Sequence, residues 1–103
     1  MPTTRSAEAT WSGDLKAGSG STSLATSGLG TFDLTWKART EDADGKTSPE
    51  ELIAAAHSSC FSMALSAGLS KAGTPPTTLE TSADVELTPG TGIFGTILQT
   101  VTP

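Results

Sequence analysis

Residues 48–66 have the sequence SPEELIAAAHSSCFSMALS, and this stretch decides the fold. Ser48 can cap the free amides at the start of a helix, Pro49 suits its first turn, and Glu51 completes a capping box from three residues on. The pattern predicts a helix that runs to Gly73. Its apolar residues fall on every side rather than along one stripe, which predicts a helix buried on nearly all sides.

Extended segments are predicted on both sides of this helix. Before it, strands are expected at residues 7–11, within 18–26 and, with the clearest alternation, at 32–38. If the third strand reaches Arg39, the alternation puts Arg39 on the opposite face from Trp36. After the helix, residues 79–87 and 92–101 predict two more strands. The expected fold class is therefore α+β, with an antiparallel sheet packed on a long buried central helix.

The length of the chain predicts one domain with a small core. A chain of 103 residues buries only about two-thirds of the surface that it exposes when unfolded. Apolar residues make up 35% of it. A helix buried all round needs more covering surface than such a sheet offers, so the sequence predicts an obligate homodimer.

Charge and composition exclude several classes of function. The net charge is -5 and the six basic residues are scattered singly, so nucleic acid is not an expected partner. There is no apolar run approaching the ~18–20 residues that span a bilayer, and residues 1–6 lack the apolar core of a signal peptide, so a cytoplasmic protein is expected. With one cysteine and no CxxC pair or His/Cys cluster, neither an intramolecular disulfide nor a metal site is expected.

Cys60 is the first candidate for chemistry. A lone cysteine in a buried helix is usually inert packing, but Cys60 lies in a short polar break, residues 57–62, where solvent or substrate can approach. The serines of this break are expected to bond back to helix carbonyls. Helical spacing puts apolar residues on the face of Cys60, and they predict an apolar pocket for the thiol: Leu52, Ala56, Met63 and Ala67.

Arg39 and Glu50 are the candidates that would activate this thiol. A thiol in an apolar pocket needs a nearby cation to become a thiolate, and a guanidinium held by a carboxylate supplies one. The alternatives are a solvated charge for Arg39 and a helix-dipole partner for Glu50. Ten residues of one straight helix separate Glu50 from Cys60 by about 15 Å. Either the helix bends or breaks near residues 58–59, or an antiparallel partner helix brings its own Glu50 to Cys60.

His57 supports a different hypothesis. It lies one turn before Cys60 and would be the general base of a cysteine hydrolase that acts on activated esters. The alternative for His57 is a satisfied core or rim residue. Trp11, Trp36 and Phe61 are expected in the core.

Residues 48–66 closely resemble the central helix motif of the OsmC branch of the OsmC/Ohr peroxidases. The resemblance extends upstream through residues 9–20 and downstream through residues 79–87. It implies an α+β homodimer of two interlocked subunits. It also implies reduction of organic hydroperoxides, with hydrogen peroxide as a further substrate, and a role in protection against oxidative and osmotic stress.

The resemblance implies a role for each candidate. Cys60 matches the peroxidatic cysteine of the family, Glu50 its active-site glutamate, and Arg39 the arginine of the OsmC branch. The implied cycle leaves a sulfenic acid on Cys60 and needs no metal, flavin or other cofactor. The reductant is expected to be an external thiol, for example a dithiol of the dihydrolipoyl type.

One departure from the family pattern concerns the end of the chain. The resolving cysteine of the family lies in a C-terminal part that would follow Pro103. Residues 1–103 are thus expected to form a single OsmC-like domain that lacks this part. The alternative function is a catalytically impaired relic, or a dimer module of the same fold that binds apolar ligands.

Overall fold

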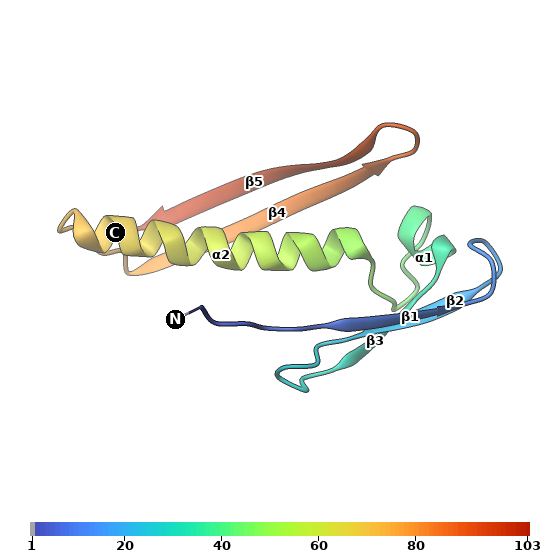
Figure 1. Ribbon diagram of the computed structural model, residues 1–103. Coiled ribbons are helices and arrows are strands. Elements are labelled where there is room, and N and C mark those ends of the chain that lie inside the picture. The colour runs from blue at the N-terminus through green and yellow to red at the C-terminus, as the bar shows by residue number, and fades with distance from the viewer. Residues whose placement is uncertain (1) are drawn as a thin grey trace. The chain divides into compact units, whose positions relative to one another are not determined.

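The computed structural model describes residues 2–103. Met1, the first residue of the N-terminal segment in which no signal peptide is expected, lies outside the described residues. The chain divides into two compact units, residues 1–49 and residues 50–103. Figure 1 shows their elements, and each unit is described by itself.

A three-stranded antiparallel sheet forms the first unit. Its strands are β1 (Glu8–Ser12), β2 (Ser19–Ser23) and β3 (Thr31–Leu34), in the order β1-β2-β3. Trp11 of β1 lies opposite Gly20 of β2, which in turn lies opposite Leu34 of β3. The two strands expected from residues 7–11 and 18–26 are confirmed.

The third strand is shorter than predicted, because a helical turn replaces its second half. Helix α1 spans Trp36–Thr40, and the Thr35 hydroxyl accepts a hydrogen bond from the Ala38 amide at 3.1 Å, which caps the helix. Since β2 begins at Ser19 and its pairing with β3 ends at Gly20 and Leu34, a strand continued past Thr35 would have no partner. The expectation that Arg39 and Trp36 lie on opposite faces is therefore wrong.

Helix α2 (Pro49–Lys71) is the long helix that residues 48–66 predict. It begins at Pro49, as expected, and ends two residues before Gly73. Gly73 has a φ of 85°, in the left-handed region that glycine adopts at helix ends. Figure 1 shows α2 as one unbroken helix, so the alternative of a break near residues 58–59 is wrong.

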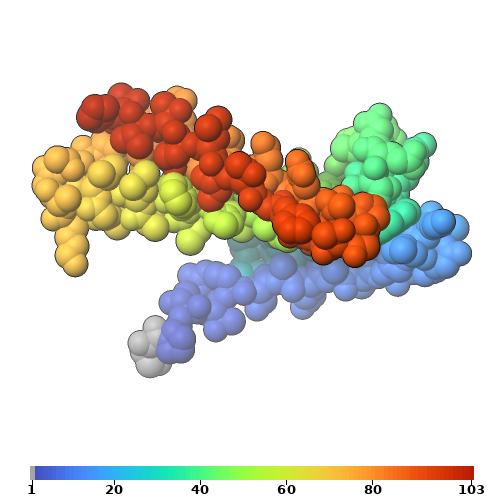
Figure 2. All heavy atoms as spheres, turned by 90° about the horizontal axis from the view of Figure 1, so that it is seen from above, coloured from blue at the N-terminus to red at the C-terminus, as the bar shows by residue number. Residues whose placement is uncertain are grey.

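A long hairpin completes the second unit and lies along α2 (Figures 1 and 2). Its strands β4 (Thr78–Thr88) and β5 (Gly92–Thr102) pair antiparallel from Thr78 opposite Thr102 to Thr88 opposite Gly92. Both predicted strands are confirmed. They form a sheet of their own, so the described chain has two antiparallel sheets rather than the single sheet expected.

A chain of polar side chains joins the hairpin to α2. The hydroxyl oxygens of Ser62 and Thr81 lie 2.5 Å apart and share a hydrogen bond. Thr81 donates to the Gln99 side-chain oxygen at 2.6 Å, and the Gln99 amide nitrogen donates to the Glu80 carbonyl at 3.1 Å. This chain, from Ser62 through Thr81 to Gln99, lies on the side of α2 that faces the hairpin.

Burial around α2 differs from the prediction. Among residues 2–103, Ala38 is the only buried apolar side chain and Glu50, at 6% exposure, the only buried charged one. The hairpin packs on one side of α2, and other sides are open: Met63 is 75% exposed. In the single chain the helix is thus not buried on all sides.

Helix α2 differs from the prediction in one further respect, its suitability as a membrane span. By length and composition it is apolar enough to cross a bilayer, contrary to the expectation that no segment would qualify. Core helices of water-soluble proteins pass the same test, because burial and membrane insertion both select apolar residues.

Candidate functional site

Cys60 lies in the middle of α2 and is exposed in the single chain. Ser62, two residues on, faces the hairpin, and a two-residue step turns about 200° around a helix. The thiol therefore points away from the hairpin. Met63 and Ala67, expected on its face, are exposed with it, so the apolar surface around the thiol is open to solvent rather than folded into a pocket.

The polar break around Cys60 has the predicted hydrogen bonds. Ser58 and Ser59 both donate to the Ala55 carbonyl, at 3.1 Å and 2.8 Å. The Ser62 hydroxyl lies 2.9 Å from the Ser58 carbonyl, which competes with Thr81 for its single proton. The hydroxyls of Ser58 and Ser59 are thus satisfied within the helix, whereas Ser62 also contacts the hairpin.

Glu50 lies in the first turn of α2 and is buried. Because α2 is continuous, its rise of about 1.5 Å per residue keeps Glu50 about 15 Å from Cys60 of the same chain. The structure of one chain does not bring these two residues together. A Glu50 that meets Cys60 has to come from a second copy.

Arg39 lies on α1 in the first unit, half-buried, with its guanidinium carbon 5.7 Å from the centre of the Trp36 ring. Residues three apart on a helix share a side, and this distance is within the range of a cation–π contact. Arg39 also borders a cavity of about 150 Å³ whose other lining residues are mostly apolar: Trp11, Leu15, Leu34, Thr35, Trp36, Thr47 and Pro49. Since Arg39 and Cys60 belong to different units, their meeting stays a prediction.

The sequence pattern does not predict the contact between Trp36 and Arg39. The alternation of residues 32–38 put Trp36 in a strand on the face opposite Arg39, whereas α1 brings the two side chains into contact. The signal that identifies α1 is Thr35, a residue that commonly caps helices.

His57 lines a second cavity, of about 380 Å³, between α2 and the hairpin. The other lining residues come from both elements: Ile53, Ala83, Val85, Ile93, Gly95, Thr96 and Ile97. Cys60 does not line this cavity. The structure thus associates His57 with the hairpin side chains and gives no support to a Cys60–His57 pair.

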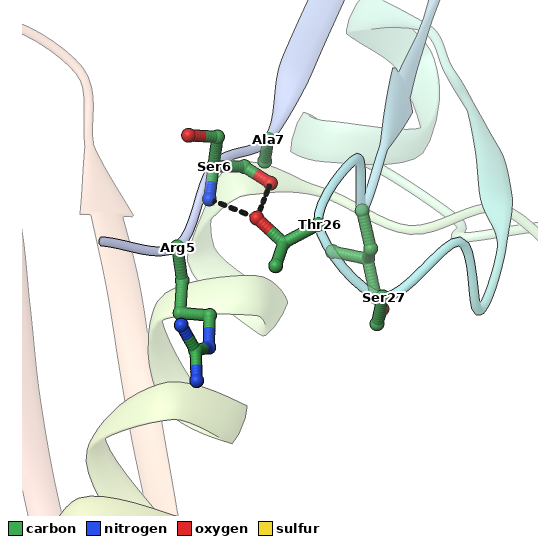
Figure 3. Close-up of a pocket in the computed structure, with 6 residues that line it drawn as sticks. Arg5, Ser6, Ala7, Thr26 and Ser27 are labelled. Carbon is green, nitrogen blue, oxygen red and sulfur yellow. Dashed lines mark hydrogen bonds between the residues drawn. The ribbon is translucent and has the colours of Figure 1, made fainter. Parts of the chain in front are cut away.

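A third cavity, of about 570 Å³, lies at the start of the chain (Figure 3). The Ser6 amide donates to the Thr26 hydroxyl at 2.6 Å, which ties the N-terminal segment to the turn after β2. The Arg5 side chain extends away from this pair in Figure 3 and donates to the Thr4 carbonyl at 3.1 Å. None of the candidate catalytic residues lines this cavity.

The described residues hold no group of three or more His, Cys, Asp or Glu side chains that could bind a metal ion. The candidate reactive groups are the exposed thiol of Cys60 on α2, the buried carboxylate of Glu50 at the start of α2, and the guanidinium of Arg39 against the Trp36 ring. The fold and the candidate site together define the class of protein: an α+β protein whose central helix carries a free thiol.

Comparison with known proteins gives the family. The family model of OsmC-like proteins matches residues 40–102, a segment that contains Glu50 and Cys60 and begins directly after Arg39. The chain is 48% identical over 80 residues to Peroxiredoxin OsmC of Escherichia coli strain K12, over 78% of this chain and 55% of the relative. Peroxiredoxin OsmC of Shigella flexneri matches with the same identity and coverage.

These matches show that the chain belongs to the OsmC-like family. The chain spans about half the length of the curated relatives it matches.

Proposed function

We propose that this protein is a thiol-dependent peroxidase that reduces organic hydroperoxides, and hydrogen peroxide as well, through Cys60. The observation that carries the proposal is the 48% identity to relatives named Peroxiredoxin OsmC. The exposed thiol of the chain's single cysteine supports it, because a peroxidatic sulfur has to be reached by its substrate.

The proposed first step is a two-electron oxidation of Cys60. The thiolate sulfur attacks one peroxide oxygen, the S–O bond forms as the O–O bond breaks, and the leaving alkoxide takes up a proton to become an alcohol. Cys60 is left as a sulfenic acid. Arg39, oriented by Glu50, stabilises both the thiolate and the leaving oxygen by charge.

The second step needs a thiol from outside. A reductant thiolate attacks the sulfenic sulfur and water leaves, which gives a mixed disulfide, and a second thiol of the reductant releases reduced Cys60. A dithiol of the dihydrolipoyl type would supply both sulfurs. No metal, flavin or other cofactor takes part in this cycle.

The proposed active form is a homodimer in the cytoplasm that serves in oxidative and osmotic stress. The separation of about 15 Å between Glu50 and Cys60 along one continuous helix supports the dimer, because an antiparallel partner helix would place its Glu50 beside Cys60. The apolar surface of α2 that is open in one chain supports it as well.

The test is rapid mixing of the reduced protein with cumene hydroperoxide, followed by trapping with dimedone and mass spectrometry. Stoichiometric dimedone labelling of Cys60, formed much faster than with a free thiol such as N-acetylcysteine, is expected. Cys60→Ser is the control and should take no label. A folded protein whose Cys60 reacts no faster than the free thiol would contradict the proposal and favour the apolar-binding relic.

A further inference from the structure

Trp36 has no part in the proposed cycle, yet it contacts one of the groups that do. Its ring centre lies 5.7 Å from the guanidinium carbon of Arg39, on the same side of α1. Cation–π contacts extend to about 6 Å from the ring centroid and are strongest for Trp. We infer that Trp36 is a positioning residue that holds the Arg39 guanidinium in the orientation it needs to stabilise an anionic sulfur; this rests on the proposed function.

The local fold explains how this contact is formed. Thr35 caps α1 at 3.1 Å, and Ala38 is buried, so the short helix is fixed at its start and on its inner side. The side chains of Trp36 and Arg39, three residues apart, therefore project from the same side of this helix. The indole lines the same cavity as Arg39, together with Trp11 and Leu34.

The chemistry of arginine explains why an indole suits the task. The arginine side chain has many rotamers, and ordering it costs free energy unless a neighbour restrains it. An aromatic ring attracts the positive charge of the guanidinium and so restrains it. The N–H groups at the edge of the guanidinium plane stay available as donors to an anion. A ring thus orients the cation without neutralising its charge, whereas a second carboxylate would neutralise it.

The experiment compares Trp36→Phe with Trp36→Leu in the full chain. Two quantities are measured: kcat/KM for cumene hydroperoxide, and the pH midpoint of Cys60 alkylation by iodoacetamide, which reports the thiolate. We expect Trp36→Leu to lower kcat/KM about three- to tenfold and raise the alkylation midpoint, since the cation–π contact is lost. Trp36→Phe, which keeps a ring, should lie between Trp36→Leu and the parent.

Phe32→Leu is the matched control. It removes an aromatic ring from β3 of the same unit that does not line the Arg39 cavity, and it should leave both quantities within about twofold, as surface changes usually do. Circular dichroism establishes that each variant is folded.

Two outcomes separate this inference from the proposed function. If Arg39→Ala slows peroxide reduction more than tenfold while Trp36→Leu matches the parent, or if Trp36→Phe and Trp36→Leu lose activity equally, the inference is overturned and the peroxidase proposal stands. If Arg39→Ala itself changes neither quantity, Arg39 has no catalytic role and the inference fails with it.

Discussion

At the scale of single residues, Gly20 shows how closely the first sheet is packed. It lies in β2 opposite Trp11, and a Cβ added there would meet the Thr10 carbonyl oxygen and lie 2.7 Å from a carbon of the Trp11 ring. Backbone atoms cannot move aside as the end of a flexible side chain can. We expect Gly20→Ala to lower the free energy of unfolding by about 1–3 kcal/mol, measured by urea denaturation.

Gly68 offers the matched control, because the same substitution meets open space there. Nothing lies within 4 Å of a Cβ added at Gly68, which is an interior residue of α2. Gly68→Ala should raise the free energy of unfolding by about 0.5–1 kcal/mol, since alanine loses less backbone entropy in a helix. A Gly20→Ala variant as stable as the parent would contradict the described packing of Trp11 on β2.

The sequence identifies the single candidate residues of the site but not how they are arranged. Cys60 stands out as the single cysteine in a polar break, and Glu50 follows a helix start that the structure confirms. The surroundings of Arg39 could not be predicted, because a period-two alternation of apolar residues hides a helical turn of five residues. Whether Arg39 meets Cys60 depends on the placement of two units, which local patterns do not encode.

At the scale of elements, the packing of the hairpin on α2 depends on a polar contact as well as an apolar one. Thr81 is the middle member of the chain from Ser62 to Gln99, with oxygen distances of 2.5 Å and 2.6 Å. Thr81→Val keeps the shape and removes both hydrogen bonds. We expect a loss of about 1–2 kcal/mol in the free energy of unfolding, because each net hydrogen bond contributes about 1 kcal/mol.

Thr78→Val makes the same change on the exposed face of the same strand and should alter stability by less than about 0.5 kcal/mol. Equal effects of the two substitutions in a urea titration would show that the Ser62–Thr81–Gln99 chain contributes nothing specific.

Elements were predictable where a pattern ran long enough to exclude the alternatives. The hairpin has eleven residues in each strand, and α2 has a capping sequence and 23 residues, so both were predicted to within about two residues. The predicted third strand failed after Leu34, where its neighbour β2 ends and the Thr35 cap favours a helix. Pairing partners, rather than propensity, decided that boundary.

At the scale of the whole molecule, the described chain has almost no core. Only Ala38 is buried among its apolar residues within the part that the structure describes, and side chains such as Met63 and Leu98 are 75% and 71% exposed. Exposed apolar surface on this scale is typical of a surface that another protein chain covers. One chain does not cover α2, and the second subunit that the sequence predicts stays a prediction.

The homodimer is tested at Met63. A lysine there would place a charge in the apolar face of α2 that carries Cys60, so Met63→Lys should convert a dimer to a monomer at micromolar concentration in sedimentation velocity. Ser82→Lys, on an exposed position of β4, is the control and should sediment as the parent does. A parent protein that is monomeric with native-like secondary structure would rule the dimer out.

The two-stranded sheet of β4 and β5 has a consequence for handling the protein in solution. In the described residues each strand pairs only with the other, so both outer edges of an eleven-residue ribbon present backbone N–H and C=O groups. Long edges of this kind add further strands readily, from a companion chain or from unfolded neighbours. At high protein concentration we therefore expect the edges of this ribbon to be the first place where chains associate, in the native assembly or in aggregates.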